Sequence, residues 1–226
     1  MAKYLTEFLG TFFVVLVIGL TTIQEVAMAP LAIGAIVMVM VYMGEHVSGG
    51  HFNPAISLTA MMRGALDMAE LLFYSIAQVL GALIGGIVVY LIVGKTFTLG
   101  PEAPYDALGM GPWLVEILFT FAWALIFLNS TTSSRTAGNS FYGLAIGFVV
   151  MVASFASSHI SGSVLNPAVG LGSSLVHTIL GVAPIAGDTI TLHIIGPLLG
   201  GVLAALVFRL QETHVNMAQV NLADEG

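Results

Sequence analysis

His51-Phe52-Asn53-Pro54-Ala55-Ile56 is the stretch from which the rest of this chain can be interpreted, because its core occurs twice. The first copy consists of His46-Val47-Ser48-Gly49, then Asn53-Pro54-Ala55 and Leu58. The second copy follows 113 residues later and consists of His159-Ile160-Ser161-Gly162, then Asn166-Pro167-Ala168 and Leu171. In each copy the Asn-Pro-Ala triplet follows a glycine-containing loop and opens a short apolar segment.

The two triplets have the residue types of a helix start. Asparagine is a favoured N-cap, and proline is favoured at the first helical position. Each helix is expected to end soon afterwards, near Met62 and near Leu175, so that each is too short to span a membrane. Two half-helices at corresponding places in the two halves of a membrane chain predict the functional site.

The composition indicates a membrane protein. Of the 226 residues, 58% are hydrophobic and 8% are charged, whereas about 25% of the residues in a soluble domain are charged. Such a chain cannot cover itself with polar surface, so we expect it to lie in a lipid bilayer. The absence of a basic patch argues against nucleic-acid binding. Because the chain has no cysteine, disulfides and thiol chemistry are excluded, and we expect no metal and no cofactor.

Six apolar runs are long enough to span a bilayer, at about 20 residues each. We expect these spans near residues 5–22, 30–47, 67–94, 111–129, 139–157 and 189–209. An even number of spans places both termini on one side. Four of the five positive charges fall on that side (Lys3, Arg63, Arg135 and Arg209), and only Lys95 falls on the other. This bias predicts that both termini are cytoplasmic, in a plasma or inner membrane.

The two ends of the chain need separate interpretation. Lys3, the apolar run 8–20 and Ala27-Met28-Ala29 also resemble a cleaved signal peptide, but Glu7 is atypical of one and the repeat requires this segment. We therefore expect it to be the first span. The polar segment 211–226 is expected to be a cytoplasmic tail that is a frayed helix or has no order.

The two halves resemble each other beyond the two loops. Three pairs of segments match: Glu7-x3-Thr11-Phe12 with Glu116-x3-Thr120-Phe121, Leu31-Ala32-Ile33-Gly34 with Leu144-Ala145-Ile146-Gly147, and Gly81-Ala82 with Gly200-Gly201. Because each half has three spans, the second half must lie upside down relative to the first. We therefore expect one membrane channel domain over residues 1–226, with inverted repeats at about 1–98 and 108–210. The small residues would let helices approach closely.

Inverted halves would bring the two half-helices together from opposite faces of the membrane. Non-helical backbone at that depth is tolerated only where it lines a wet cavity or is buried in protein. Loops 46–52 and 159–165 would supply carbonyl acceptors, and Asn53 and Asn166 would supply NH2 donors. Two facing helix N-termini place about half a positive charge each at the centre, which repels cations and protons. Water and small neutral solutes are therefore the expected permeants.

On these motifs the chain resembles the aquaporins, or major intrinsic proteins, over about residues 4–210. The resemblance implies an all-α membrane protein, a right-handed bundle of six transmembrane helices plus two re-entrant half-helices. It also implies a pore in each subunit of a homotetramer, without enzymatic activity. In the family, the residues that match Glu7 and Glu116 brace the two loops. We expect His46 and His159 to make structural hydrogen bonds beside these loops, and His51 to narrow the cytoplasmic mouth.

The resemblance also locates a selectivity filter, and here the sequence departs from the family. Four side chains form the filter, commonly with an arginine directly after the second Asn-Pro-Ala, where this chain has Val169. By spacing, the other three are Ile33, Ser154 and Ser163. The usual aromatic, histidine and arginine side chains are absent. The resemblance therefore implies a broader, uncharged ring that could admit glycerol, urea, ammonia, hydrogen peroxide or neutral metalloid hydroxides.

Two other classes of protein were compared with a channel. Secondary transporters share inverted repeats, but they need an ionisable coupling group near the midplane, and the two motifs contain no Asp or Glu. An intramembrane enzyme would need a catalytic constellation, and the sequence has no recognisable nucleophile or metalloprotease motif. The sequence therefore favours a passive channel, with the transporter as the alternative.

Overall fold

The computed structural model describes residues 1–102, 109–180 and 187–224, with side chains through Thr213, and in these residues the regular structure is helical throughout. The α-helices are α1 (Ala2–Ile23), α2 (Ala29–Ser48), α3 (Pro54–Arg63), α4 (Met68–Val93), α6 (Gly111–Phe127), α7 (Tyr142–Ser161), α8 (Pro167–Ile179) and α9 (Gly187–Asp224). A π-helical turn, Leu128–Thr132, and a 3₁₀ turn, Ser134–Thr136, follow α6. Among the described helices, six are long and apolar enough to span a bilayer, and α3 and α8 are not among them. This confirms the expected fold class.

Several boundaries differ from the expectation, and three of them are informative. The fifth span begins at Tyr142 instead of residue 139, because Asn139 closes a turn by accepting a hydrogen bond from the backbone N–H of Phe141, 3.1 Å away. The second half-helix continues to Ile179, beyond the expected end near Leu175. The last helix continues through the polar segment after residue 210, as far as Asp224.

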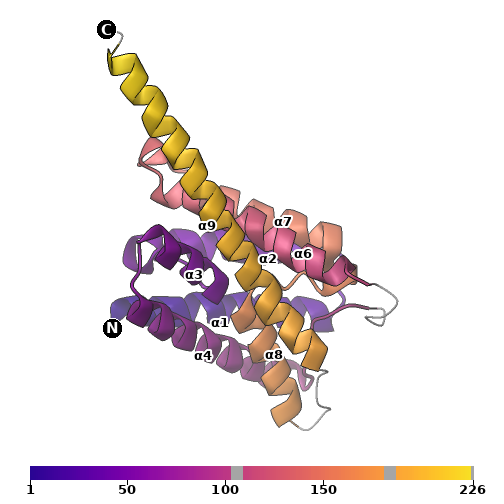
Figure 1. Cartoon of the computed structure of the whole chain (residues 1–226). Helices are drawn as coiled ribbons and strands as arrows, with labels where there is room; N and C mark the ends of the chain where they lie inside the picture. Colours follow the sequence, from indigo (N-terminus) through magenta and orange to yellow (C-terminus); the bar gives the residue numbers. More distant parts are fainter. Residues whose placement is uncertain (103–108, 181–186, 225–226) are drawn as a thin grey trace.

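Side-chain contacts hold the first turn of this polar extension against the bundle. Glu212 accepts a hydrogen bond from Ser133 at 3.1 Å and lies 3.6 Å from the guanidinium of Arg63. Gln211 accepts a hydrogen bond from Asn129 at 3.1 Å. Farther along, α9 extends past the other helices (Figure 1). The polar composition after residue 210 therefore does not end the helix.

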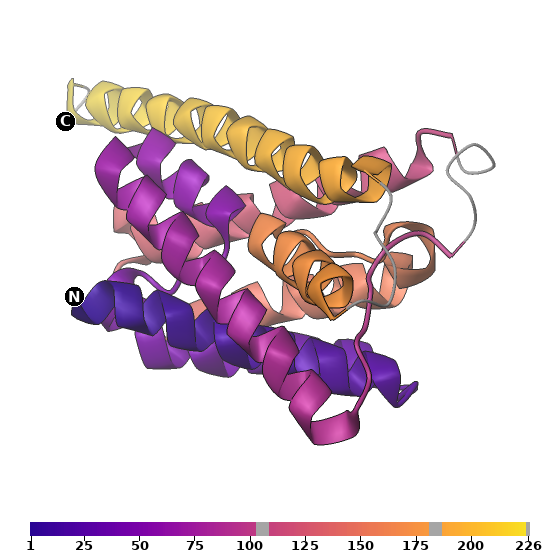
Figure 2. The ribbon, with the colours of Figure 1, turned by 90° about the horizontal axis from the view of Figure 1, so that it is seen from below.

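The helices pack in a pattern that repeats between the halves. The first span of each half packs against the second and third spans of its own half: α1 against α2 and α4, and α6 against α7 and α9. The two halves join through α2 and α7, and each half-helix packs against the last span of the opposite half, α8 against α4 and α3 against α9. Both termini lie at the same end of the bundle (Figure 2). This exchange of half-helices places the starts of α3 and α8 in the interior.

Glycines allow the halves to join closely. A Cβ atom on Gly34 of α2 would lie 2.6 Å from the carbonyl oxygen of Gly147 of α7, and a Cβ on Gly147 would lie 2.6 Å from the carbonyl oxygen of Gly34. Larger residues therefore cannot occupy this crossing without moving the backbones apart. Gly81 and Gly200 lie against backbone atoms of α1 and α6 in the same way.

Candidate functional site

Glu7 of α1 holds the loop that precedes the first Asn-Pro-Ala. Its carboxylate is fully buried. One oxygen accepts hydrogen bonds from the Ser48 hydroxyl at 2.6 Å and from the backbone N–H of His51 at 3.0 Å. The other accepts from the backbone N–H of Phe52 at 2.6 Å and from the Gln78 amide at 2.7 Å. The four donors compensate for the cost of burying a carboxylate at this depth.

Glu116 of α6 makes nearly the same set of contacts in the second half. One oxygen accepts hydrogen bonds from the Ser161 hydroxyl at 2.7 Å and from the backbone N–H of Val164 at 2.9 Å. The other accepts from the backbone N–H of Leu165 at 2.7 Å. Glu116 is also fully buried. Each carboxylate therefore orders the backbone that immediately precedes an Asn-Pro-Ala triplet.

The two triplets meet in a reciprocal arrangement. The side chain of Asn53 caps α3 by accepting a hydrogen bond from the backbone N–H of Ala55 at 2.8 Å, and Asn166 caps α8 through Ala168 at 3.0 Å. Each amide NH2 reaches across: Asn53 donates to the carbonyl oxygen of Leu165, and Asn166 donates to the carbonyl oxygen of Phe52, both at 2.9 Å. The two helix N-termini therefore face each other inside the bundle.

The backbone at this junction is strained. Phe52 and Leu165, each directly before an asparagine, have φ angles of 51° and 52°, a region that bulky residues rarely adopt. In both residues the N–H is bound by a buried glutamate and the C=O by the asparagine of the opposite half. These hydrogen bonds hold the conformation that directs each carbonyl across the junction.

A cavity of about 280 Å³ lies on the side of Asn166 and contains all four expected filter residues in its wall. Ile33, Ser154, Ser163 and Val169 line it together with Asn166. The hydroxyls of Ser157 and Ser163 are 3.3 Å apart, and Val169 is almost fully buried. Glu102 also lines this outer cavity, and it is the only ionisable side chain among the described lining residues.

A second cavity, of about 340 Å³, lies on the other side of the junction. His51 lines it, and the imidazole Nδ1 lies 3.1 Å from the Ser57 hydroxyl. The imidazole packs edge-on against the ring of Phe127, with centroids 5.2 Å apart. Three charged side chains also line this inner cavity: Lys3, Glu45 and Glu70. His51 therefore forms part of the wall of this inner cavity, and its role as a cytoplasmic constriction stays a prediction.

His46 and His159 flank the two loops, but among the described residues neither side chain makes a hydrogen bond to a loop. Both are exposed, on the last turns of α2 and α7. The His159 imidazole pairs with Glu102 at 2.6 Å, outside the loop that Glu116 holds. The reason is helical phase, because the serines two residues later, Ser48 and Ser161, turn inward to the glutamates.

The sequence reasoning missed several buried side chains at this site, among them His193 of α9, whose imidazole lies 3.0 Å from the carbonyl oxygen of Ser161. Tyr74 of α4 contacts the first loop, and Gln78 of α4 donates to the Glu7 carboxylate that holds this loop. Trp123 and Phe127 of α6 line the outer and the inner cavity. A clue to Trp123 lay in the repeat, because it follows Glu116 by seven residues, as Val14 follows Glu7.

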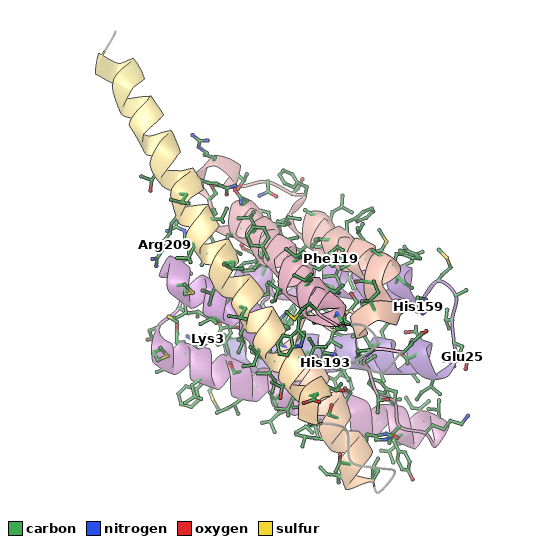
Figure 3. All side chains as sticks on the ribbon, turned by 45° about the vertical axis from the view of Figure 1, so that its right-hand side comes forward. Lys3, Glu25, Phe119, His159, His193 and Arg209 are labelled. Carbon is green, nitrogen blue, oxygen red and sulfur yellow. The ribbon has the colours of Figure 1, made fainter. Side chains whose placement is uncertain are left out.

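Charged groups lie toward the two ends of the bundle. Lys3 and Arg209 lie toward one end, and Glu25 and His159 toward the other (Figure 3). His193 lies between them and is almost fully buried. Between the ends, the buried glutamates are satisfied by hydrogen bonds rather than by cations.

The chain was also compared with known proteins. The major intrinsic protein family model matches residues 1–208. The chain is 33% identical to glycerol uptake facilitator protein-like 6 of Lactiplantibacillus plantarum, covering 93% of this chain and 98% of that protein. It is also 33% identical to aquaporin Z of Brucella melitensis, covering 92% and 96%. The aquaglyceroporin structure from Plasmodium falciparum shares the fold at 20% identity, with a TM-score of 0.75 and coverage of 92% and 94%. The reciprocal Asn-Pro-Ala junction and these matches together show that the chain belongs to the major intrinsic protein family.

Proposed function

We propose that this protein is a passive transmembrane channel for water and small neutral solutes. The observation that carries the proposal is the junction of α3 and α8, where Asn53 and Asn166 each donate to a carbonyl of the opposite half at 2.9 Å. Cavities on both sides of this junction give solutes access to it from either face. The facing helix N-termini disfavour cations at the centre, so a neutral hydrogen-bond acceptor is the solute that fits.

The solutes include molecules larger than water. The four proposed filter residues, Ile33, Ser154, Ser163 and Val169, provide two hydroxyls and two aliphatic side chains, and none carries a charge. Without a guanidinium, this ring lacks a fixed cation and up to five N–H donors. Glycerol, urea, ammonia, hydrogen peroxide and neutral metalloid hydroxides are the candidate solutes that such a ring admits.

The experiment is stopped-flow light scattering of proteoliposomes. The proposal expects water permeability well above that of protein-free liposomes, with a low activation energy. It also expects reswelling after shrinkage in a urea gradient. A water permeability equal to that of empty liposomes contradicts the channel function. A flux with a high activation energy, or one that depends on an ion gradient, would instead support a secondary transporter.

The assembly and orientation are also proposals. The spanning helices expose large apolar side chains, for example Leu31, Val39 and Tyr42 on α2 and Phe148, Val152 and Phe155 on α7. We propose that this surface faces lipid or further copies of the chain in a homotetramer, with both termini cytoplasmic in a plasma or inner membrane. Native mass spectrometry tests the tetramer, and protease access to the C-terminal helix in sealed vesicles tests the orientation.

A further inference from the structure

We propose that Trp123 of α6, rather than the outer ring of filter residues, sets the upper size of the solutes that cross this protein. The inference rests on the proposed channel function. It concerns a side chain that is buried in the bundle, 5% exposed, and lines the outer cavity together with Asn166.

Trp123 belongs to a second ring of side chains, deeper than the filter residues. The ring consists of Val14, Val37, Trp123 and Val150, which are all buried and all line the outer cavity. Val37 follows Ile33 by one helical turn on α2, and Val150 precedes Ser154 by one turn on α7. Because α2 and α7 run in opposite directions across the bundle, both steps lead away from the outer ring and toward the junction.

The repeat shows that tryptophan is the exception in this inner ring. Val37 and Val150 are equivalent, each lying three residues after the glycine at the crossing of α2 and α7. Trp123 is equivalent to Val14, each lying seven residues after a loop-holding glutamate. One half thus places an indole where the other half places an isopropyl group. In the outer ring, Ser154, Ser163 and Val169 are small, and Ile33 is the largest side chain. The indole of Trp123 is larger than any of these, so the largest side chain of the two rings belongs to the inner ring.

The two cavities reach α6 at neighbouring positions. Trp123 lines the outer cavity and not the inner one, whereas Phe127, one turn farther along the same face, lines the inner cavity and not the outer one. Phe127 in turn packs against the His51 imidazole. Among the described residues of α6, the boundary between the two cavities therefore lies between Trp123 and Phe127. A solute that enters from the outer side meets the indole of Trp123 first.

The indole also contributes a donor. Its N–H makes no hydrogen bond with the part of the chain that the structure describes, and an indole N–H can only donate. Thin neutral molecules that accept hydrogen bonds, such as water, ammonia and hydrogen peroxide, fit a passage beside a flat ring. Bulkier polyols such as glycerol clear the small side chains of the outer ring but are slowed at Trp123.

The test compares glycerol and water permeability in proteoliposomes that carry the full chain. Trp123→Val restores the residue found at the equivalent position 14, and we expect the ratio of glycerol to water permeability to rise by about tenfold. Trp123→Phe retains a smaller ring and is expected to give an intermediate ratio. Val14→Trp adds a second indole from the opposite half and should lower the ratio below that of the unaltered protein.

The matched control is Trp113→Val. Trp113 is the only other tryptophan, lies near the outer end of α6 and is not among the residues that line the described cavities. Its replacement should leave the ratio unchanged. If Trp123→Val does not fold, the opposite shifts expected of Trp123→Phe and Val14→Trp still decide the question.

The outcomes separate this inference from the function on which it rests. If the unaltered protein conducts water but the ratio of glycerol to water permeability is the same in all Trp123 variants, the inference is wrong and the channel function stands. Water flux no higher than in protein-free liposomes overturns the channel function, and the inference with it. A ratio that rises equally in Trp113→Val also contradicts the inference, because the effect would then come from general loosening of α6.

Discussion

Tyr74 and His193 hold equivalent loops from the third span of each half. The Tyr74 hydroxyl donates to the carbonyl oxygen of Ser48 at 2.8 Å, and the imidazole Nε2 of His193 lies 3.0 Å from the carbonyl oxygen of Ser161. Because a carbonyl can only accept, Nε2 of His193 must carry its proton. Two different side chains thus solve the same problem, which is to satisfy the carbonyl at the end of the helix before each loop.

We expect Tyr74→Phe and His193→Phe to destabilise the protein through this contact. Each leaves a buried carbonyl without its donor, at a cost of about 1–3 kcal/mol. Thermal unfolding in detergent should show a lower midpoint for both variants. Tyr90→Phe, on the partly exposed end of α4, is the control. Midpoints equal to that of the control would contradict the importance of these two donors.

The buried glutamates should be sensitive to a change from carboxylate to amide. In Glu7→Gln and Glu116→Gln, one oxygen becomes an NH2 group that faces existing donors. We expect each variant to lose about 2 kcal/mol or more, because hydrogen bonds to a buried charged group are lost. The loss should be larger for Glu7, which accepts four hydrogen bonds, than for Glu116, which accepts three.

Chemical unfolding and water permeability measure this effect. Glu45→Gln is the matched control, because Glu45 lines the inner cavity without holding either loop. A Glu7→Gln protein as stable as Glu45→Gln would show that the loops do not depend on the buried charge.

Val169→Arg should make the outer ring more selective for water. A guanidinium at this position adds a positive charge and donors beside Ser163 and narrows the cavity. Urea permeability is expected to fall by about tenfold relative to water. Val169→Met adds length without charge, and stopped-flow assays of the two variants side by side separate bulk from electrostatics. Equal changes in both would assign the effect to bulk.

Proton exclusion should persist without a filter cation. The first turns of α3 and α8 face each other across the junction, so their dipoles place positive potential where a proton or hydronium ion would have to pass. Liposomes with an internal pH dye should therefore show no faster proton entry with the protein than without it. A large protein-dependent leak would mean that the helix fields alone are insufficient.

The crossing of α2 and α7 should not tolerate side chains. Gly34→Ala and Gly147→Ala each place a methyl carbon 2.6 Å from a backbone carbonyl oxygen of the other helix, and such overpacking costs about 1–3 kcal/mol. Gly187→Ala is the control, since among the described residues no other helix places a heavy atom within 4 Å of its Cβ position. Thermal unfolding curves that coincide for all three variants would disprove the steric argument.

Local chemistry explains why the broad architecture could be predicted from the sequence. Apolar runs of spanning length, the Asn-Pro start of each half-helix and the odd number of spans in each half follow from residue order alone. The polar extension of α9 could not be predicted in this way, because its first turn is held by Arg63, Asn129 and Ser133, which are distant in sequence.

The interior of the site depended on tertiary structure for the same reason. The sequence alone determined that Glu7, Glu116 and two Asn-Pro-Ala triplets occur in an inverted repeat. Only the fold decided that His46 and His159 face outward, whereas Tyr74 reaches the first loop and Gln78 reaches the Glu7 carboxylate that holds it. Which side chain of a helix meets a loop depends on helical phase and on which neighbouring helix packs there, and neither is encoded in a short motif.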